Sequence, residues 1–223
     1  QRQMCIRDRS EIIRNPEGWM LDFSTKLKWN YCHGLECQAF LDVYDRYGGD
    51  YLYKYVKQFA DTMINENGRI YGYKKTNYNL DHVNSGKILF RLYEREKYPR
   101  YKIAMDTLRA QLASQPRTSE GGFWHKKIYP YQMWLDGIYM GSPFYAQYAA
   151  TFNEPEDFAD VVSQFLIIAK HTYDKKTGLY RHAWDEIKAL PWSDLKTGQA
   201  PHVWGRALGW YMMAIVDALD FIP

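Results

Sequence analysis

The stretch YPYQMWLDGIYMGSPF, residues 129–144, places one carboxylate, that of Asp136, among aromatic side chains and a methionine. Asp is a favoured helix-capping residue, and Gly137 opens an apolar run, so we expect a helix to begin here. On a structural interpretation, Asp136 only caps this helix. On a functional interpretation, the crowded carboxyl loses hydration, which raises its pKa and keeps its proton available for general acid catalysis.

Apolar residues recur at helical spacing along most of the chain, in segments that turns and prolines divide into pairs. The first helix of each pair is expected to start near residue 29, 79, 136 or 203. The breaks within pairs fall at Gly48–Gly49, at Pro99 and at residues 153–155, and the last helix runs to Pro223 without a partner. This irregular period of roughly 50 to 65 residues is typical of stacked helix pairs.

Three long connections, residues 71–79, 114–131 and 175–201, carry aromatic, histidine or lysine side chains. Connections of this length in a compact domain are usually functional. In an all-α barrel of the (α/α)6 type they would lie at one rim of a central cavity. Closing six helix pairs requires about 300 to 350 residues at this period. We therefore expect residues 29–223 to be a C-terminally truncated part of such a barrel, with about four pairs.

The N-terminal residues are set apart from this pattern. Residues 1–10, QRQMCIRDRS, show no helical periodicity and resemble a translated sequencing adapter, so we interpret them as a non-native scar. Residues 11–28 contain Pro16 and Gly18 and are expected to be a connector. The native N-terminus is then not visible in the sequence.

Composition limits the function classes. A chain of 223 residues with 46% hydrophobic and 25% charged residues is globular and fits one domain. Twenty Tyr, eight Trp and ten Phe suit stacking on sugar rings, although a rigid core uses the same residues. A net charge of +3 with no dense basic run argues against nucleic acid. No apolar stretch is long enough to span a membrane, and the N-terminus lacks the apolar region of a signal peptide. These features do not decide export, and we expect a cytoplasmic location rather than a secreted one.

The cysteines indicate neither a disulfide framework nor a metal. Cys5, Cys32 and Cys37 are an odd set in a mid-sized chain. Cys32, His33 and Cys37 could suggest a metal site, but no second pair of ligands follows. We expect no metal and no other cofactor.

Four motifs resemble a known family in the family's own order. They are NLDHVNSG, SEGGFWHKKIYPYQMWLDGIYMGSPF, LYRHAWDE and PHVWGRALGWY. Together they are similar to the unsaturated rhamnogalacturonyl hydrolases of glycoside hydrolase family 105, which are related to the unsaturated glucuronyl hydrolases of family 88. The resemblance covers residues 29–223. It implies an (α/α)6 barrel that acts on oligosaccharides ending in a 4,5-unsaturated uronic acid, as polysaccharide lyases leave them during pectin degradation.

The resemblance also implies a mechanism. Asp136, the acid of WLDG, would protonate C4 of the substrate's vinyl ether and then help water to add at C5. Because the double bond and not the glycosidic oxygen accepts the proton, one carboxylate can do both steps. The usual pair of carboxylates that flanks a scissile bond is then unnecessary.

The resemblance implies a set of substrate-binding residues as well. Asp81 of NLDHVNSG would hold sugar hydroxyls and raise the pKa of Asp136, whereas on a structural interpretation it caps a helix. Arg206 is expected to bind the uronate carboxylate as a planar fork, and solvent is expected to screen Lys126 in its long loop. The other residues expected to line the pocket are Tyr31, Trp134, His182, Trp204 and Trp210.

Two other function classes stay open at this point. An inverting glycosidase on the same fold would need a second carboxylate to activate water, and Asp81 could be that residue. A helical-repeat binding module would also contain helix pairs, but its repeats are usually shorter and alike. The favoured hypothesis is the unsaturated uronyl hydrolase, monomeric at full length, with an oligosaccharide as its partner and no membrane or nucleic acid.

Overall fold

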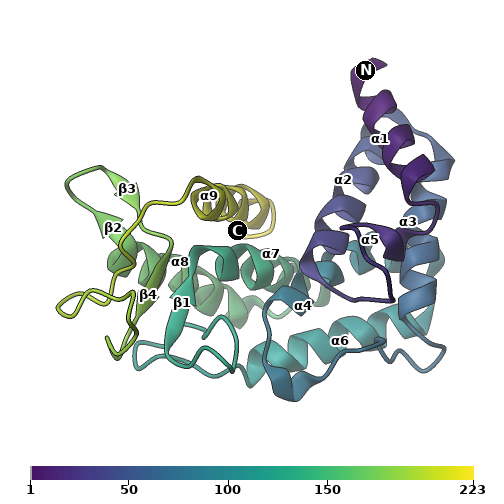
Figure 1. Cartoon of the computed structure of the whole chain (residues 1–223). Coiled ribbons are helices and arrows are strands. Elements are labelled where there is room, and N and C mark those ends of the chain that lie inside the picture. Colours follow the sequence, from purple (N-terminus) through teal and green to yellow (C-terminus); the bar gives the residue numbers. More distant parts are fainter. Residues whose placement is uncertain (1) are drawn as a thin grey trace. The chain divides into compact units, whose positions relative to one another are not determined.

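The computed structural model describes residues 2–223, with side chains from Asp8 onwards, and it is mainly helical (Figure 1). The helices are α1 (Arg2–Arg14), α2 (Tyr31–Tyr47), α3 (Asp50–Met63), α4 (Asp81–Asn84), α5 (Ile88–Glu96), α6 (Pro99–Ala113), α7 (Leu135–Phe152), α8 (Phe158–Thr172) and α9 (Gly205–Leu219). Short 3-10 turns are η1 (Gly18–Met20), η2 (Lys75–Asn77), η3 (Ser85–Lys87) and η4 (Pro155–Asp157). The strands are β1 (Gln132–Trp134), β2 (Tyr173–Asp174), β3 (Leu179–Tyr180) and β4 (Ala183–Asp185).

The chain divides into two compact units. The first contains the residues up to Tyr73 together with residues 84–108, and the second contains residues 74–83 and 109–223. All but one of the residues expected to bind substrate belong to the second unit.

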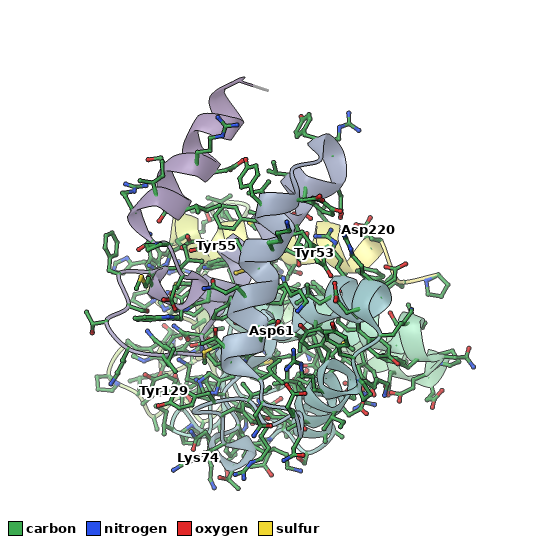
Figure 2. The ribbon with its side chains drawn as sticks, turned by 90° about the vertical axis from the view of Figure 1, so that its right-hand side faces the viewer. Tyr53, Tyr55, Asp61, Lys74, Tyr129 and Asp220 are labelled. Atoms are coloured by element: carbon green, nitrogen blue, oxygen red, sulfur yellow. The ribbon has the colours of Figure 1, made fainter. Side chains whose placement is uncertain are left out.

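In the first unit, α2 and α3 form the expected helix pair. Gly48 ends α2 with a positive φ of 75°, which glycine adopts without a steric penalty, and its N–H donates to the carbonyl of Tyr44. Figure 2 shows Tyr53, Tyr55 and Asp61 along α3. The Tyr55 hydroxyl donates to the carbonyl of Asn15 at 2.7 Å, which ties the segment after α1 to this helix.

The second unit is organised around α7, which is buried along most of its length. In Figure 1, α9 lies along α7. The rings of Tyr139 and Trp210 join these two helices with centroids 4.7 Å apart. The Tyr211 hydroxyl donates to the carbonyl of Phe165 at 3.2 Å, which ties α9 to α8. This packing fixes the direction in which the first turns of α7 and α9 point.

Two small antiparallel sheets complete the second unit, and the sequence patterns did not predict them. β1 pairs with β4 so that Trp134 lies opposite Ala183, and β2 pairs with β3. Strands of two or three residues are too short to show an alternating apolar pattern. The β1–β4 pairing matters for function because it brings two distant motifs together directly before α7.

The predicted helix pairs are confirmed, and the first helices start at Tyr31, Asp81, Leu135 and Gly205. The helix expected near residue 79 is a single turn, α4, that continues through η3 into α5. In the segment expected to be a connector, α1 continues to Arg14 and η1 follows. The origin of residues 1–10 stays a prediction, and Gln1 and the side chain of Cys5 lie outside the described residues.

No helix within residues 2–223 combines the length and the apolar character that crossing a bilayer requires.

Candidate active site

Asp136 is the second residue of α7 and is half-buried. The residue in the N-cap position is Trp134, with extended backbone, so the interpretation of Asp136 as the cap is wrong. Burial raises the pKa of the Asp136 carboxyl, as does the nearby Asp81, whereas Arg206 and His182 oppose the shift. Its Oδ2 atom is buried and has no hydrogen-bond partner among the described residues. Asp136 therefore combines a raised pKa with a buried oxygen that no described side chain or backbone group engages.

The turn from β1 into α7 brings His182 close to Asp136. The N–H of Leu135 donates to the carbonyl of His182 at 2.9 Å, and the neighbouring Ala183 pairs with Trp134 across the sheet. Burial lowers the pKa of His182, and its Nδ1 atom is buried without a hydrogen-bond partner among the described residues. The prediction that LYRHAWDE and WLDG meet in one site is therefore supported by direct backbone pairing.

Asp81 is buried at the start of α4 and is engaged through both carboxylate oxygens. Oδ2 lies 2.5 Å from the Nζ atom of Lys126, and Oδ1 lies 3.4 Å from Nε2 of His125. The side chain that caps this turn is Asn79, whose Oδ1 accepts the N–H of Asp81 at 3.0 Å. The Asp81 carboxylate is thus used for its neighbours in the site and not as a cap.

Lys126 differs from its expected role. Its side chain is only 20% exposed and forms an ion pair with Asp81, so the expectation that solvent screens it was wrong. The sequence could not reveal this pair because 45 positions separate the two residues.

His125 is a site residue that the sequence analysis missed. It is buried beside Asp81, and burial lowers its pKa to about 4 although the carboxylate opposes the shift. A Cβ atom on Gly137 would lie 2.8 Å from Nδ1 of His125, so only glycine lets α7 approach this ring so closely. The signal that could have indicated His125 was its position next to Lys126 in FWHK.

Two buried glutamines hold the loops on either side of Asp81 and His125. Nε2 of Gln115 donates to the carbonyls of Tyr78 at 2.9 Å and Trp124 at 2.8 Å, and Nε2 of Gln111 donates to that of Asn79 at 3.1 Å. Because these bonds are shielded from water, they fix both loops firmly. The segments that carry Asp81 and His125 are therefore held by Gln111 in the last turn of α6 and by Gln115 just after this helix.

Trp134 forms part of an aromatic stack. Its ring lies nearly parallel to His125, with centroids 4.6 Å apart, and nearly parallel to Tyr129, with centroids 5.0 Å apart. Its Nε1 donates to Oε1 of Gln132 at 3.1 Å, which fixes the ring further. Trp134 thus lies in the predicted site with its ring already stacked on protein side chains.

The start of α9 supplies a cation and an aromatic ring. The Arg206 guanidinium lies 3.9 Å from the ring centroid of Trp204, which is 44% exposed. Arg206 forms no ion pair with any acidic side chain in the described part of the chain, yet its charge lowers the pKa of Asp136. Trp210 is buried against Tyr139, so it supports the packing of α7 on α9, and its contact with substrate stays a prediction.

Tyr31 is the first residue of α2 and belongs to the first unit, where its carbonyl accepts Nδ2 of Asn84 at 3.0 Å. Its role in binding stays a prediction.

From residue 8 onwards, where side chains are described, no three His, Cys, Asp or Glu side chains cluster as metal ligands. His33, a candidate ligand, contacts the carbonyl of Trp19 through Nε2 at 3.1 Å instead.

Comparison with known proteins places this geometry in a family. The chain aligns with a glycoside hydrolase from family 105 of C. acetobutylicum ATCC 824 with a TM-score of 0.90 and 43% sequence identity, over 96% of this chain and 58% of that one. Protein Atu3128 of Agrobacterium fabrum is 40% identical over 84 residues, which are 38% of this chain and 36% of that protein. Unsaturated rhamnogalacturonyl hydrolase YesR of Bacillus subtilis is 29% identical over 116 residues, 50% of this chain and 32% of that protein.

The present chain therefore spans less than two thirds of each of these relatives. The similarity to the family 105 structure confirms the predicted (α/α)6 fold class, while the number of helix pairs in the whole protein stays a prediction. The sequence profile of Glycosyl Hydrolase Family 88 matches residues 6–223, and the chain belongs to this family.

Proposed function

We propose that this chain carries the acid of an enzyme that removes a 4,5-unsaturated uronic acid from the non-reducing end of lyase-generated oligosaccharides. The observation that carries the proposal is Asp136, a half-buried carboxyl with a raised pKa and an unpartnered Oδ2 atom, which lies within the electrostatic influence of Arg206. The name of the Bacillus subtilis relative supports unsaturated rhamnogalacturonan as the substrate class.

The reaction needs one proton donor and one water molecule. Asp136 donates its proton to C4, and the positive charge that develops at C5 is shared with the ring oxygen. Water attacks C5 while the Asp136 carboxylate accepts the proton that the water loses. The resulting hemiketal opens to a ketone at C5, and the hemiacetal left at C1 releases the sugar that was attached there. Asp136 ends the cycle protonated, as it began.

The different surroundings of Asp136 and Asp81 favour this reaction over that of a two-carboxylate glycosidase. A general base must have an oxygen available for water, but both oxygens of Asp81 face cationic or basic neighbours, Lys126 and His125. Asp81 is better suited to accept hydroxyl hydrogen bonds from the sugar and to keep the pKa of Asp136 raised.

Arg206 is the cation best placed to bind the carboxylate of the substrate. Lys126 forms an ion pair with Asp81, whereas Arg206 has no carboxylate partner among the described side chains and lies over the ring of Trp204. A guanidinium can bind a carboxylate through two parallel hydrogen bonds, which orients the sugar ring as well as attracting it.

From the sequence we retain the predictions of a monomer and of a cytoplasmic location.

The test is the absorbance of the conjugated double bond during incubation with a panel of lyase products. We expect the wild-type protein to remove this absorbance with at least one product and Asp136→Asn to be strongly impaired. Saturated oligosaccharides of the same linkage serve as the control. Cleavage of the saturated control with equal efficiency would show a conventional glycosidase and contradict the proposal.

A further inference from the structure

We propose that Trp192 is a further substrate-binding residue, which stacks on the sugar attached to the unsaturated uronate. This inference rests on the proposed function. It assigns a residue from the segment 187–200, which lies between the motifs LYRHAWDE and PHVWGRALGWY and in which the sequence analysis identified no binding residue.

The first observation is a group of three tryptophans around His182. The centroid of the Trp192 ring lies 6.1 Å from that of His182, with the planes tilted by 40°. Trp204 and Trp134 approach the same imidazole edge-on, at 6.1 Å and 6.5 Å. One ring from β1 and two rings from the connection between β4 and α9 thus meet at His182, whose charge opposes the raised pKa of Asp136.

The second observation concerns which of these rings can accept a sugar. Trp134 already stacks on His125 and Tyr129, and one face of Trp204 is occupied by the guanidinium of Arg206. Trp192 is half-buried, and its one aromatic contact among the described residues is the tilted contact with His182. Its ring therefore keeps area on which a pyranose can stack.

The third observation is that the loop before Trp192 is firmly built. Oδ2 of the fully buried Asp185 accepts the N–H groups of Ala189 at 2.8 Å and Leu190 at 3.1 Å. The carbonyl of Leu190 then accepts both the N–H and the hydroxyl of Ser193, each at 3.0 Å. Trp192 lies inside this closed turn.

The base of the same loop is closed by backbone pairing. The N–H of Asp185 donates to the carbonyl of Gly198 at 2.9 Å, and a Cβ atom on Gly198 would lie 2.2 Å from the carbonyl oxygen of Asp185. A half-buried tryptophan presented by a pre-organised loop loses little conformational entropy on binding a ligand, which is the property of a binding platform.

The positions of the residues around Asp136 indicate which ring of the substrate Trp192 would contact. His182 and Arg206 both influence the pKa of Asp136, so the reacting uronate occupies the space near these residues. Trp134 directly precedes α7, which carries Asp136, and Trp204 directly precedes α9, which carries Arg206. Trp192 instead reaches His182 from the loop that Asp185 closes, so we assign it to the next ring of the substrate. The sugar at C1 of the uronate is the next ring of the substrate.

The subsite predicts a specific kinetic pattern. The leaving sugar departs only after C4 has been protonated and C5 hydrated, so a stacking contact to it acts equally on substrate and transition state. Such uniform binding changes KM and leaves kcat unaltered. We expect Trp192→Ala to raise KM about tenfold for an unsaturated uronyl–rhamnose disaccharide, with kcat within about twofold of wild type. For the methyl glycoside of the same uronate, which lacks the second ring, KM should change little.

Two variants keep the experiment interpretable. Trp192→Phe retains a stacking ring and should keep KM for the disaccharide within about threefold of wild type. Leu195→Ala removes an apolar side chain that is 82% exposed in the same loop, and it should alter neither substrate's kinetics. Thermal unfolding of each variant shows whether the loop has been retained.

The outcomes separate the two levels of the proposal. A rise in KM that is confined to the disaccharide and is relieved in Trp192→Phe supports the subsite. Unchanged kinetics in Trp192→Ala, or an equal rise for both substrates, would overturn it while leaving the proposed function in place. If the wild-type protein consumes neither unsaturated compound, the proposed function itself fails, and the subsite with it.

Discussion

The Nζ atom of Lys126 lies 2.5 Å from Oδ2 of Asp81, and both side chains are largely shielded from solvent. This pair neutralises one of the two acids of the site and leaves the other, Asp136, with a buried oxygen that has no partner in the described part of the chain. The two carboxyls are therefore chemically distinct before any substrate binds. We expect Asp136 to transfer the proton and Asp81 to bind and to position.

Replacing Asp136 by Asn should lower kcat by roughly 10²- to 10⁴-fold with little change in the fold, because an amide cannot donate an acidic proton. Steady-state kinetics on an unsaturated disaccharide measure the effect. Asp220→Asn, at an exposed aspartate just after α9, is the matched control and should behave as wild type. Near-normal turnover in Asp136→Asn would assign the proton transfer to another residue.

The same substitution should also stabilise the protein at neutral pH. Because the pKa of Asp136 is raised in the folded state, the unfolded chain loses this proton first as the pH rises. Ionisation of Asp136 therefore lowers the free energy of unfolding. This loss is absent below the ordinary Asp pKa of about 3.9 and is complete above the raised pKa of the folded state. Denaturant unfolding should show equal stability of wild type and Asp136→Asn near pH 3 and a more stable variant at pH 7. A variant that is less stable at pH 7 would contradict the raised pKa.

His125 should make the protein sensitive to acid in a defined range. Its pKa is lowered to about 4, so the unfolded chain takes up this proton near the ordinary His value of about 6.5 while the folded chain does not. Stability contributed by the neutral ring is present above pH 6.5 and is lost as the pH falls towards 4. The loss is at most roughly 3 kcal/mol by proton linkage.

The measurement for His125 is urea unfolding between pH 4 and 7.5, with His125→Gln as the comparison. The variant should show a flatter dependence on pH. His202→Gln, at an exposed histidine, is the control that should keep the wild-type slope. If the slopes of all three proteins agree, His125 is not the group responsible.

Removing Lys126, the ion-pair partner of Asp81, should lower both the stability and the activity of the protein. Lys126→Ala leaves a buried carboxylate without its cation, and we expect a loss of about 2 to 4 kcal/mol in stability together with a lower kcat/KM. In the double variant with Asp81→Asn, much of the stability should return, because the uncompensated charge is gone. Additive losses in this double-mutant cycle would show that the two side chains do not interact.

Arg206→Lys should raise KM or lower kcat/KM by an amount equivalent to roughly 1 to 3 kcal/mol, since an ammonium cannot reproduce a two-pronged bond to a carboxylate. Stability should change little because the Arg206 side chain is exposed. Kinetics on a substrate whose uronate is converted to its methyl ester provide the control, because Arg206→Lys should then differ little from wild type. An equal effect on acid and ester would place the carboxylate elsewhere.

Much of the fold could be predicted from the sequence because the helices are long and amphipathic. The start of α7 at Leu135 and of α9 at Gly205 lay within two residues of expectation. Local patterns could not show contacts between distant segments. The β1–β4 pairing that places His182 beside Trp134 involves strands of three residues, too short for a periodic signal.

The candidate site was predicted in part for the same reason. The aromatic surroundings of Asp136 correctly indicated a raised pKa, since its cause is local burial. The environment of Lys126 was misjudged, because its partner Asp81 is contributed by a different segment. His125 was overlooked because a histidine in a loop gives no sign of how deeply it is buried. Each miss concerns tertiary packing and not local propensity.

The central claim is that the double bond, and not the glycosidic oxygen, receives the proton from Asp136. The most direct test follows the reaction of an unsaturated disaccharide in D₂O by proton NMR. The account predicts that the vinyl signal of C4 disappears no later than the reducing sugar appears, and that the first-formed product carries deuterium at C4. Release of the sugar together with an unsaturated uronic acid that keeps its C4 vinyl signal would contradict it.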